Sequence, residues 1–379
     1  MDNKRLSVIG ETHQSVKRLA LPAALLAASL ASVQVTASPA ISGGIWINYT
    51  YVGNDGDPAE TADVISDNEG GFIGDEALIL YFDDQKEGSP WSMSAEMRYG
   101  PGAYTRASEN STGDNFSLHK AWVAYQIDES KQVKVGKSQV PFGWKTYNNW
   151  PGDMLLGGYG DQMDVGVKLS GSVSAISYDA AYFHADDWGE SSTDTQSDNG
   201  HWGSPTTYRK VKTLVANAAY QFAKDQKVGM SLQSGKLQAL NDAEGEHPVN
   251  GEHSAWVAYY TGQFDQVTVQ AEYMGTRREL PEGNLNALGG DEVKNDRAAL
   301  LLGYTSGDWF WFLDATQASA GTDGNVAGDV TAFSPGVTYN YGQGWIYLEY
   351  LTQDGFINRD GMVGEGDYSA LYATIDYYF

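Results

Sequence analysis

Charged residues recur at alternate positions in short segments whose other positions are apolar. In segment 91–99, Glu96 and Arg98 share one face with serines, while tryptophan, methionine and alanine occupy the other face. Because side chains of a strand alternate between two faces, these charges would line a polar surface. Charges that line a narrow aqueous passage favour ions of the opposite sign. The same alternation gives seven candidates for ion selection: Glu96, Arg98, Lys134, Asp164, Lys168, Asp179 and Glu272.

The pattern leaves two points about these charges open. Lys120 alternates with Trp122 and His119 alternates with Val123, so either Lys120 or His119 could face the polar side. Acidic and basic side chains on neighbouring strands can also pair and simply stabilise the wall. Ion selection and cross-strand pairing therefore both remain open.

A catalytic interpretation of the same region is weaker. Ser117 and His119 would share a strand face, and a serine–histidine pair with an acidic partner can hydrolyse lipid esters. However, the sequence has no G-x-S-x-G element. A lipid hydrolase without a lumen would also suit a smaller barrel than the one derived below. We therefore expect no enzyme.

One acidic stretch invites a metal hypothesis. Segment 54–70, "NDGDPAETADVISDNEG", contains six acidic residues and no basic residue, but it lacks the full EF-hand pattern. The chain has no cysteine, which excludes thiolate metal sites and disulfides. We predict no resident metal and no cofactor. We instead expect this stretch to be a solvated, highly charged surface loop at the mouth of the barrel derived below, bridged to lipopolysaccharide through divalent ions.

Sixteen segments of roughly ten residues carry the apolar–polar alternation of strands. They cover residues 42–52, 71–83, 91–99, 116–126, 132–137, 163–171, 176–184, 212–222, 227–236, 253–263, 267–276, 296–306, 309–317, 329–341, 344–353 and 367–379.

The connections between these segments are sorted by length. A long polar stretch follows every odd-numbered segment, and a short turn such as "IDES" or "AKDQK" follows every even-numbered one. This is typical of an antiparallel barrel in a membrane, with short periplasmic turns and long extracellular loops. Open sheet edges in hydrocarbon would leave backbone groups unpaired, so the sheet must close. The fold class is thus all-β: a sixteen-stranded transmembrane barrel wide enough for an aqueous lumen. An adhesin or binding barrel would fit the long loops equally well.

The first 37 residues are typical of a secretory signal peptide. Lys17 and Arg18 precede an apolar run that ends in small residues before Ser38. No later run reaches about 18 apolar residues, as a transmembrane helix would require. The segment 1–37 carries four basic and two acidic residues, so its removal changes the net charge from −25 to −27 and leaves a barrel domain over 38–379. Such an acidic chain is a poor nucleic-acid binder.

Two stretches carry a resemblance to a known family. Segments 119–144 and 160–173 resemble the signature region of the phosphate-selective porin O/P family of Gram-negative outer membranes. The first motif is matched by Gly136, Pro141, Phe142 and Gly143, and the second by Asp164, Val165, Gly166, Leu169, Ser170 and Gly171. The resemblance implies a homotrimeric outer-membrane porin that passes small hydrophilic solutes or ions passively.

The sequence departs from the motif of this family at basic positions that bear on the solute preference. Gln139 stands where the family has lysine, Met163 replaces the expected arginine, and Lys137 is an additional basic residue. The resemblance favours anions such as phosphate, whereas the acidic net charge favours cations. The solute preference therefore stays open.

The resemblance also implies an inward-folded third loop over residues 138–162. Glycines allow tight turns in it, and its apolar residues could pack on the inner wall or, alternatively, on a neighbouring subunit. Lys137 and Lys145 would stand at the base of this loop. The expected constriction residues are Trp144, Trp150, Met154, Leu155, Leu156, Gly157 and Gly158.

The chain ends on an aromatic residue within a strand pattern. Tyr377 and Phe379 follow other apolar residues at alternate positions. By resemblance to outer-membrane proteins generally, they form the signal that the barrel-assembly machinery recognises. The segment 367–379 would also pair with 42–52 to close the barrel among outer-membrane lipid and lipopolysaccharide.

Overall fold

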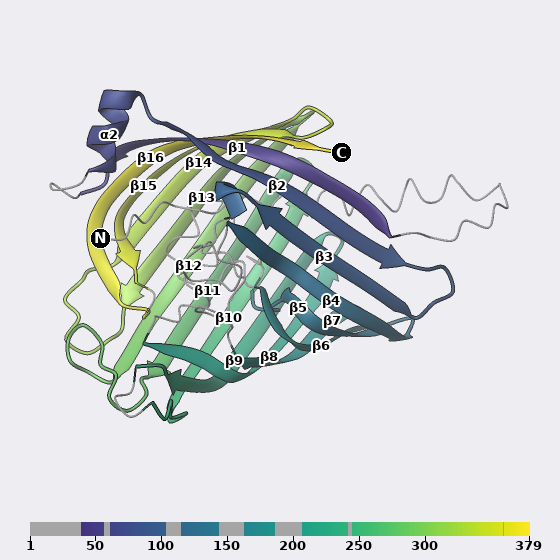
Figure 1. The fold of residues 1–379 in the computed structure, drawn as a ribbon, viewed down its shortest axis with the longest axis horizontal. Coiled ribbons are helices and arrows are strands. Elements are labelled where there is room, and N and C mark those ends of the chain that lie inside the picture. The colour runs from purple at the N-terminus through teal and green to yellow at the C-terminus, as the bar shows by residue number, and fades with distance from the viewer. Residues whose placement is uncertain are drawn as a thin grey trace.

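A computed structural model describes residues 39–56, 61–103, 115–143, 163–185, 207–241, 245–358 and 360–379. Sixteen strands form one closed barrel (Figure 1). They are β1 (Ala40–Asn54), β2 (Phe72–Gln85), β3 (Trp91–Tyr99), β4 (Phe116–Asp128), β5 (Lys131–Gln139), β6 (Met163–Val173), β7 (Ile176–Ala185), β8 (Tyr208–Ala223), β9 (Gln226–Ala239), β10 (Gly251–Phe264), β11 (Val267–Glu279), β12 (Glu292–Ser306), β13 (Trp309–Ala320), β14 (Val330–Asn340), β15 (Trp345–Ile357) and β16 (Val363–Tyr378). A helix, α2 (Ala62–Glu69), and a 3-10 turn, η1 (Pro101–Ala103), accompany them.

Each strand pairs antiparallel with its neighbours in the chain, and β1 pairs with β16 to close the sheet. The closing register places Gly44 opposite Tyr378 and Tyr51 opposite Leu371. The all-β, sixteen-stranded fold class predicted from the sequence is therefore confirmed. The largest differences in boundaries are four residues, at the starts of β8, β12 and β16 and at the end of β15, where the strands extend further than predicted.

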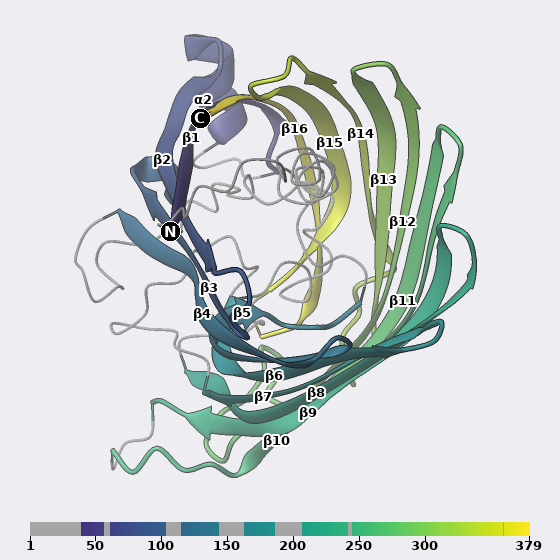
Figure 2. The ribbon, with the colours of Figure 1, turned by 90° about the vertical axis from the view of Figure 1, so that its right-hand side faces the viewer.

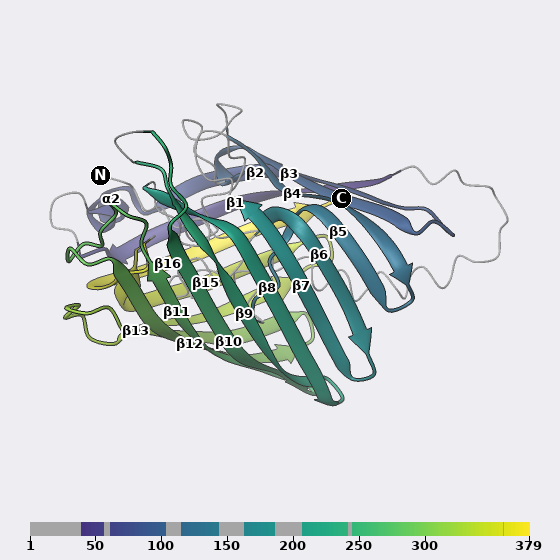
Figure 3. The ribbon, with the colours of Figure 1, turned by 90° about the horizontal axis from the view of Figure 1, so that it is seen from below.

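The connections fall into two sets at opposite ends of the barrel. The end that carries the turns between even-numbered strands and the next strand, together with the C-terminus, is called the short-turn end (Figures 1 and 3). Three two-residue turns there contain Ser174, Asp225 and Asp265 at positive φ, and a fourth contains Gly307. Positive φ at the first turn residue, as in Ser174, Asp265 and Gly307, matches the primed turns whose twist suits hairpins. The opposite, long-loop end carries α2.

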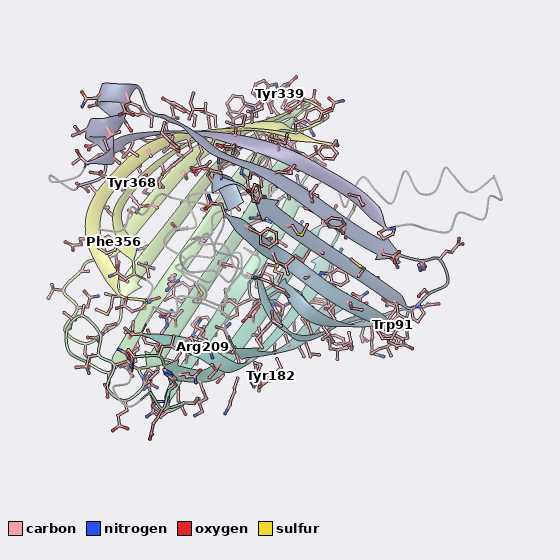
Figure 4. All side chains as sticks on the ribbon, viewed as in Figure 1. Trp91, Tyr182, Arg209, Tyr339, Phe356 and Tyr368 are labelled. Carbon is pink, nitrogen blue, oxygen red and sulfur yellow. The ribbon has the colours of Figure 1, made fainter. Side chains whose placement is uncertain are left out.

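The two faces of the wall have opposite polarity. Outward positions carry exposed apolar side chains such as Leu214, which is 62% exposed, whereas the buried inward positions carry charged and polar side chains together with several apolar clusters. Figure 4 shows Trp91, Tyr182 and Tyr339 on the outside of the wall. This distribution inverts that of a soluble protein and suits a lipid exterior around a polar interior. Among the described helices, none is long and apolar enough to cross a membrane.

Candidate functional site

The inner wall of the barrel holds a nearly balanced set of buried charges. Of the 17 basic and 34 acidic residues in the described ranges, seven basic and six acidic side chains are buried. The excess of acid is therefore concentrated in exposed parts of the molecule. The buried basic residues are Arg98, Lys120, Lys137, Lys168, Lys210, Arg278 and Arg297, and the acidic ones are Glu96, Asp164, Glu272, Asp314, Glu349 and Asp376.

The first cluster lies on β3 and β4. The Arg98 guanidinium donates to Glu96 Oε1 at 2.9 Å and lies 5.4 Å from the centroid of the Trp46 ring. Lys120 Nζ is 4.0 Å from Glu96 Oε2. The Glu96 carboxylate thus interacts with both Arg98 and Lys120. Because these groups are buried, we expect their charge-assisted contacts to keep a fixed geometry.

A β-bulge settles the orientation of His119 and Lys120. Between Glu96, which lies opposite Lys120, and Met97, which lies opposite Leu118, the register shifts, so that His119 is the extra residue of the bulge and both consecutive side chains are buried. A bulge inserts one extra residue and interrupts the alternation of faces. The sequence pattern left these two residues as alternatives, and the structure buries both.

Lys137 joins the same cluster through an irregularity in β5. Arg98, Lys120 and Lys137 are the charges that act on the buried His119 side chain. Lys137 and Ser138 are both buried, although regular alternation would separate them. The preceding Gly136 has a φ of 121°, in the region that favours glycine.

A second basic pair lies on β5 and β6. Lys134 and Lys168 are Cα partners across the two strands. Lys168 Nζ donates to the Gln139 carbonyl at 2.6 Å, and Lys134 Nζ lies 4.3 Å from the Trp122 ring centroid. Each ammonium group thus has its own stabilising contact, so two like charges can stand side by side. Asp164, also predicted to face inward, is buried near the other end of β6.

The chain after β5 turns into the barrel. Val140 and Phe142 pack in one cluster with inner-wall residues of β7, β8, β10, β11 and β12. The Gly143 amide donates to Ser231 Oγ at 3.0 Å, and a Cβ on Gly143 would lie 2.7 Å from Glu272 Oε2. The start of the third loop therefore leaves β5 and packs inside the barrel against the inner wall of β7 to β12.

The rest of the predicted constriction lies outside the described residues. This applies to Trp144, Lys145, Trp150, Met154, Leu155, Leu156, Gly157 and Gly158. Residues 57–60 of the acidic stretch also lie outside them. Within the described ranges, no group of His, Asp and Glu side chains has the geometry of a metal site.

Four further residues of the inner wall are candidates for contact with the solute and were not predicted from the sequence. Lys210 and Arg278 lie beyond the strand ends predicted at residues 212 and 276, whereas His253 and Arg297 lay within predicted strands and were not singled out. All four are buried on the inner wall near the long-loop end, and Lys210 and Arg278 are the charges that act on His253. Extending the alternation past residue 276 would have placed Arg278 on the inner face. It would have placed Lys210 on the outer face with Leu214, because the register shift between Val211 and Leu214 interrupts the alternation.

Comparison with protein families agrees with this geometry. The model of the family "Phosphate-selective porin O and P" matches residues 92–328, which is more than half of the chain. The chain belongs to this porin family. Its match includes the clusters on β3 to β6 and the inward turn at 140–143. A search of curated proteins gives no match to this porin.

Solved porins share the fold of this porin at low identity. The outer membrane channel DcaP of Acinetobacter baumannii is 12% identical, with a TM-score of 0.61 over 92% of this chain and 99% of that one. An anion-selective porin from Comamonas acidovorans is 12% identical, with a TM-score of 0.60 over 90% and 99%. OmpT of Vibrio cholerae is 11% identical, with a TM-score of 0.59 over 90% and 97%. At these identities the likeness supports the fold alone.

Proposed function

We propose that this porin is a passive, anion-preferring channel for small hydrophilic solutes in the outer membrane of a Gram-negative bacterium. The observation that carries the proposal is the contrast between the buried wall, with seven basic and six acidic residues, and all the described residues together, with 17 and 34. Because a low-dielectric throat strengthens nearby charges, the wall outweighs the distant acidic loops for an ion inside. Phosphate is one candidate solute.

The distribution of charge around the wall supports the sign of this preference. Apart from Asp128 and Lys131, which form an exposed ion pair beside the turn between β4 and β5, the basic residues of β3 to β6 are Arg98, Lys120, Lys134, Lys137 and Lys168, and the acidic ones are Glu96 and Asp164. Glu96 is shared between Arg98 and Lys120. This side of the lumen is thus a positive surface along which an anion can move. Size selection comes from the third loop, whose first residues pack inside the barrel.

The reversal potential under a salt gradient tests the preference. We expect wild-type protein in a planar bilayer to prefer anions, and Lys134→Glu with Lys168→Glu to lower the anion-to-cation permeability ratio at least about twofold. Lys236→Glu with Lys294→Glu changes the net charge equally at two exposed lysines, paired with Glu252 and Glu292, and should leave the ratio nearly unchanged. Equal effects of the two pairs would contradict a cationic throat.

The alternatives to a channel predict different behaviour. A serine hydrolase would need Ser117 and His119 to act on substrate, whereas His119 lies within a cluster of three cations that suits an anion better than a catalytic base. The mechanism proposed here has no chemical step. A folded barrel that does not conduct would instead favour an adhesin or binding protein.

The setting of the channel follows from the same proposal. Residues 1–37 would be removed on export, the short-turn end would face the periplasm, and the barrel would assemble as a homotrimer among lipid and lipopolysaccharide. Tyr377 and Phe379 would serve the assembly machinery. Both side chains are exposed, at 51% and 65%, and the Phe379 backbone pairs with Gly43 in both directions.

A further inference from the structure

The hairpin formed by the far ends of β15 and β16 leaves the barrel wall. Pairing of β14 with β15 ends at Gln353, and pairing of β1 with β16 ends at Ser369. Beyond these points, Gly355 to Ile357 pair only with Val363 to Glu365. A register shift between Gln353 and Gly355 marks the place where the two strands separate from the wall, and bulges bend strands in this way. We call the described residues 355–358 and 360–365 the mouth hairpin.

Glycine is required where the mouth hairpin bends. A Cβ on Gly355 would collide with the Val330 side chain of β14 and would approach the Gly364 carbonyl to 2.6 Å. Phe356, at the long-loop end in Figure 4, stacks over Gly364, where a Cβ would lie 2.5 Å from its ring. The hairpin therefore leans across β14 toward the lumen. Figure 2 shows the yellow strands β15 and β16 curving away from the wall at their long-loop ends.

The tip of the mouth hairpin is anchored on the far side of the barrel. Met362 packs in an apolar socket formed by Tyr208, Leu237, Leu280 and Val293. These residues belong to β8, β9, the end of β11 and β12, and β8 lies eight strands from β16 in the closed order. The hairpin thus spans the long-loop mouth from one wall to the other.

Polar contacts hold the same tip. Asn295 Nδ2 donates to the Gly361 carbonyl at 2.7 Å, and the Tyr208 hydroxyl donates to the Asp360 carbonyl at 3.4 Å. Along its length, the hairpin is also held by Asn325, whose amide donates to the Val363 carbonyl at 2.9 Å. All three acceptors are backbone carbonyls, so the contacts depend on the position of the tip rather than on its side chains.

We propose that the mouth hairpin is a size filter at the long-loop entrance, separate from the constriction by the third loop. The mouth hairpin limits the size of the solutes that enter, because it extends from β16 to β8 across the opening through which they pass. This inference rests on the proposed channel function. Release of Met362 from its socket should widen the entrance while leaving the wall pairs of the barrel intact, since the tip lies beyond them.

The filter can be tested by releasing the tip. Met362→Asp places a charge in the apolar socket and should raise single-channel conductance at least about 1.5-fold. It should also speed entry of a tetrasaccharide more than that of a monosaccharide in liposome swelling. The matched control is Val326→Asp, on the neighbouring loop, where the side chain is 96% exposed. Retention of the folded, heat-modifiable band confirms that each variant barrel is intact.

A disulfide provides the opposite test. The chain has no cysteine, and a Cβ on Gly361 would lie 3.2 Å from Val293 Cγ1, which is close enough for an engineered bridge. Oxidised Gly361→Cys with Val293→Cys should exclude the tetrasaccharide, and a reductant should restore its entry. Gly361→Cys alone controls for strain at Gly361, and neither this variant nor Val293→Cys alone should respond to reductant.

The outcomes separate the filter from the channel. If wild type conducts but Met362→Asp and Val326→Asp have equal conductance and equal solute cut-off, the hairpin is not a filter. If the tetrasaccharide enters the Gly361→Cys, Val293→Cys variant equally well in its oxidised and reduced states, the proposed filter is contradicted as well. If the wild-type barrel itself does not conduct, the channel proposal fails, and the filter fails with it.

Discussion

A single glycine, Gly136, determines where a charged side chain lies on the inner wall. At Gly136 the backbone adopts a φ of 121°, and a Cβ would collide with the Ala121 carbonyl and lie 2.9 Å from Trp122 Cα. This close approach of β4 and β5 coincides with the point where Lys137 and Ser138 are both buried. A residue with a side chain would push the strands apart and move Lys137 away from His119.

Gly136→Ala tests this role. It should destabilise the folded barrel by about 1–3 kcal/mol, because a strained φ and a backbone collision coincide. The measurement is the urea midpoint at which the heat-modifiable folded band is lost. Gly342→Ala is the matched control, since Gly342 has a φ of 95° but nothing within 4 Å of its Cβ position. Equal losses would show that the approach of β4 and β5 is unimportant.

At the scale of elements, α2 protects an irregular point of the closing strand pair. The pairing of β1 with β16 shifts register between Val52 and Asn54. There the Val52 amide donates to Ser66 Oγ of α2 at 3.0 Å, in a buried position. A buried N–H without a partner is costly, so a helix in the first long loop supplies an acceptor at the seam. Gly70, in the left-handed conformation, ends this helix.

Removal of that acceptor should loosen the seam locally. Ser66→Ala should cost about 1–3 kcal/mol and speed hydrogen exchange at the Val52 amide. Ser89→Ala is the control, because Ser89 Oγ accepts from the Trp91 amide at 3.1 Å in an exposed turn, where water can replace the hydroxyl. Unchanged exchange at Val52 in Ser66→Ala would argue against the protective role of α2.

The strands could be predicted from the sequence, whereas the irregular parts could not. Alternation over about ten residues is a local signal, and it found all sixteen strands and the inward side of Arg98 and Lys168. The bulge at His119 arises from pairing with β3, which alternation within β4 cannot reveal. The mouth hairpin is rich in glycine and acid, and its strands pair only with each other, so its sequence looks like a loop.

At the scale of the molecule, net charge is a poor guide to the lumen. The chain carries −25, yet its buried wall is slightly basic, because acids gather where water solvates them and bases face the interior. Barrel closure makes this separation possible, since every strand has one face toward the lumen and one toward the outside. The ion preference of the channel therefore depends on the charges at inward positions rather than on the net charge of the chain.

Deletion of Phe379 should impair assembly rather than transport. The Phe379 backbone makes two hydrogen bonds with Gly43, and its side chain is the terminal aromatic group of the last strand. We expect a lower yield of inserted barrels in membrane fractions. The barrels that do insert should keep the wild-type reversal potential, because Phe379 is remote from the inner-wall clusters. Phe379→Tyr, which keeps the ring and both backbone bonds, should assemble normally. A changed reversal potential in the deletion variant would contradict this separation.

The pairing of β1 with β16 also has a consequence for the order of folding events. Thr374 hydrogen-bonds to Asn48 across 326 positions of the chain, whereas every other strand pair joins chain neighbours. Compared with a hairpin loop of about twenty residues, this closure spans about four doublings of length, an entropic cost of roughly 2–3 kcal/mol. Hairpins should therefore form early, and an open sheet with two free edges should be the longest-lived intermediate. The slowest step of folding is then the meeting of the two ends of the chain.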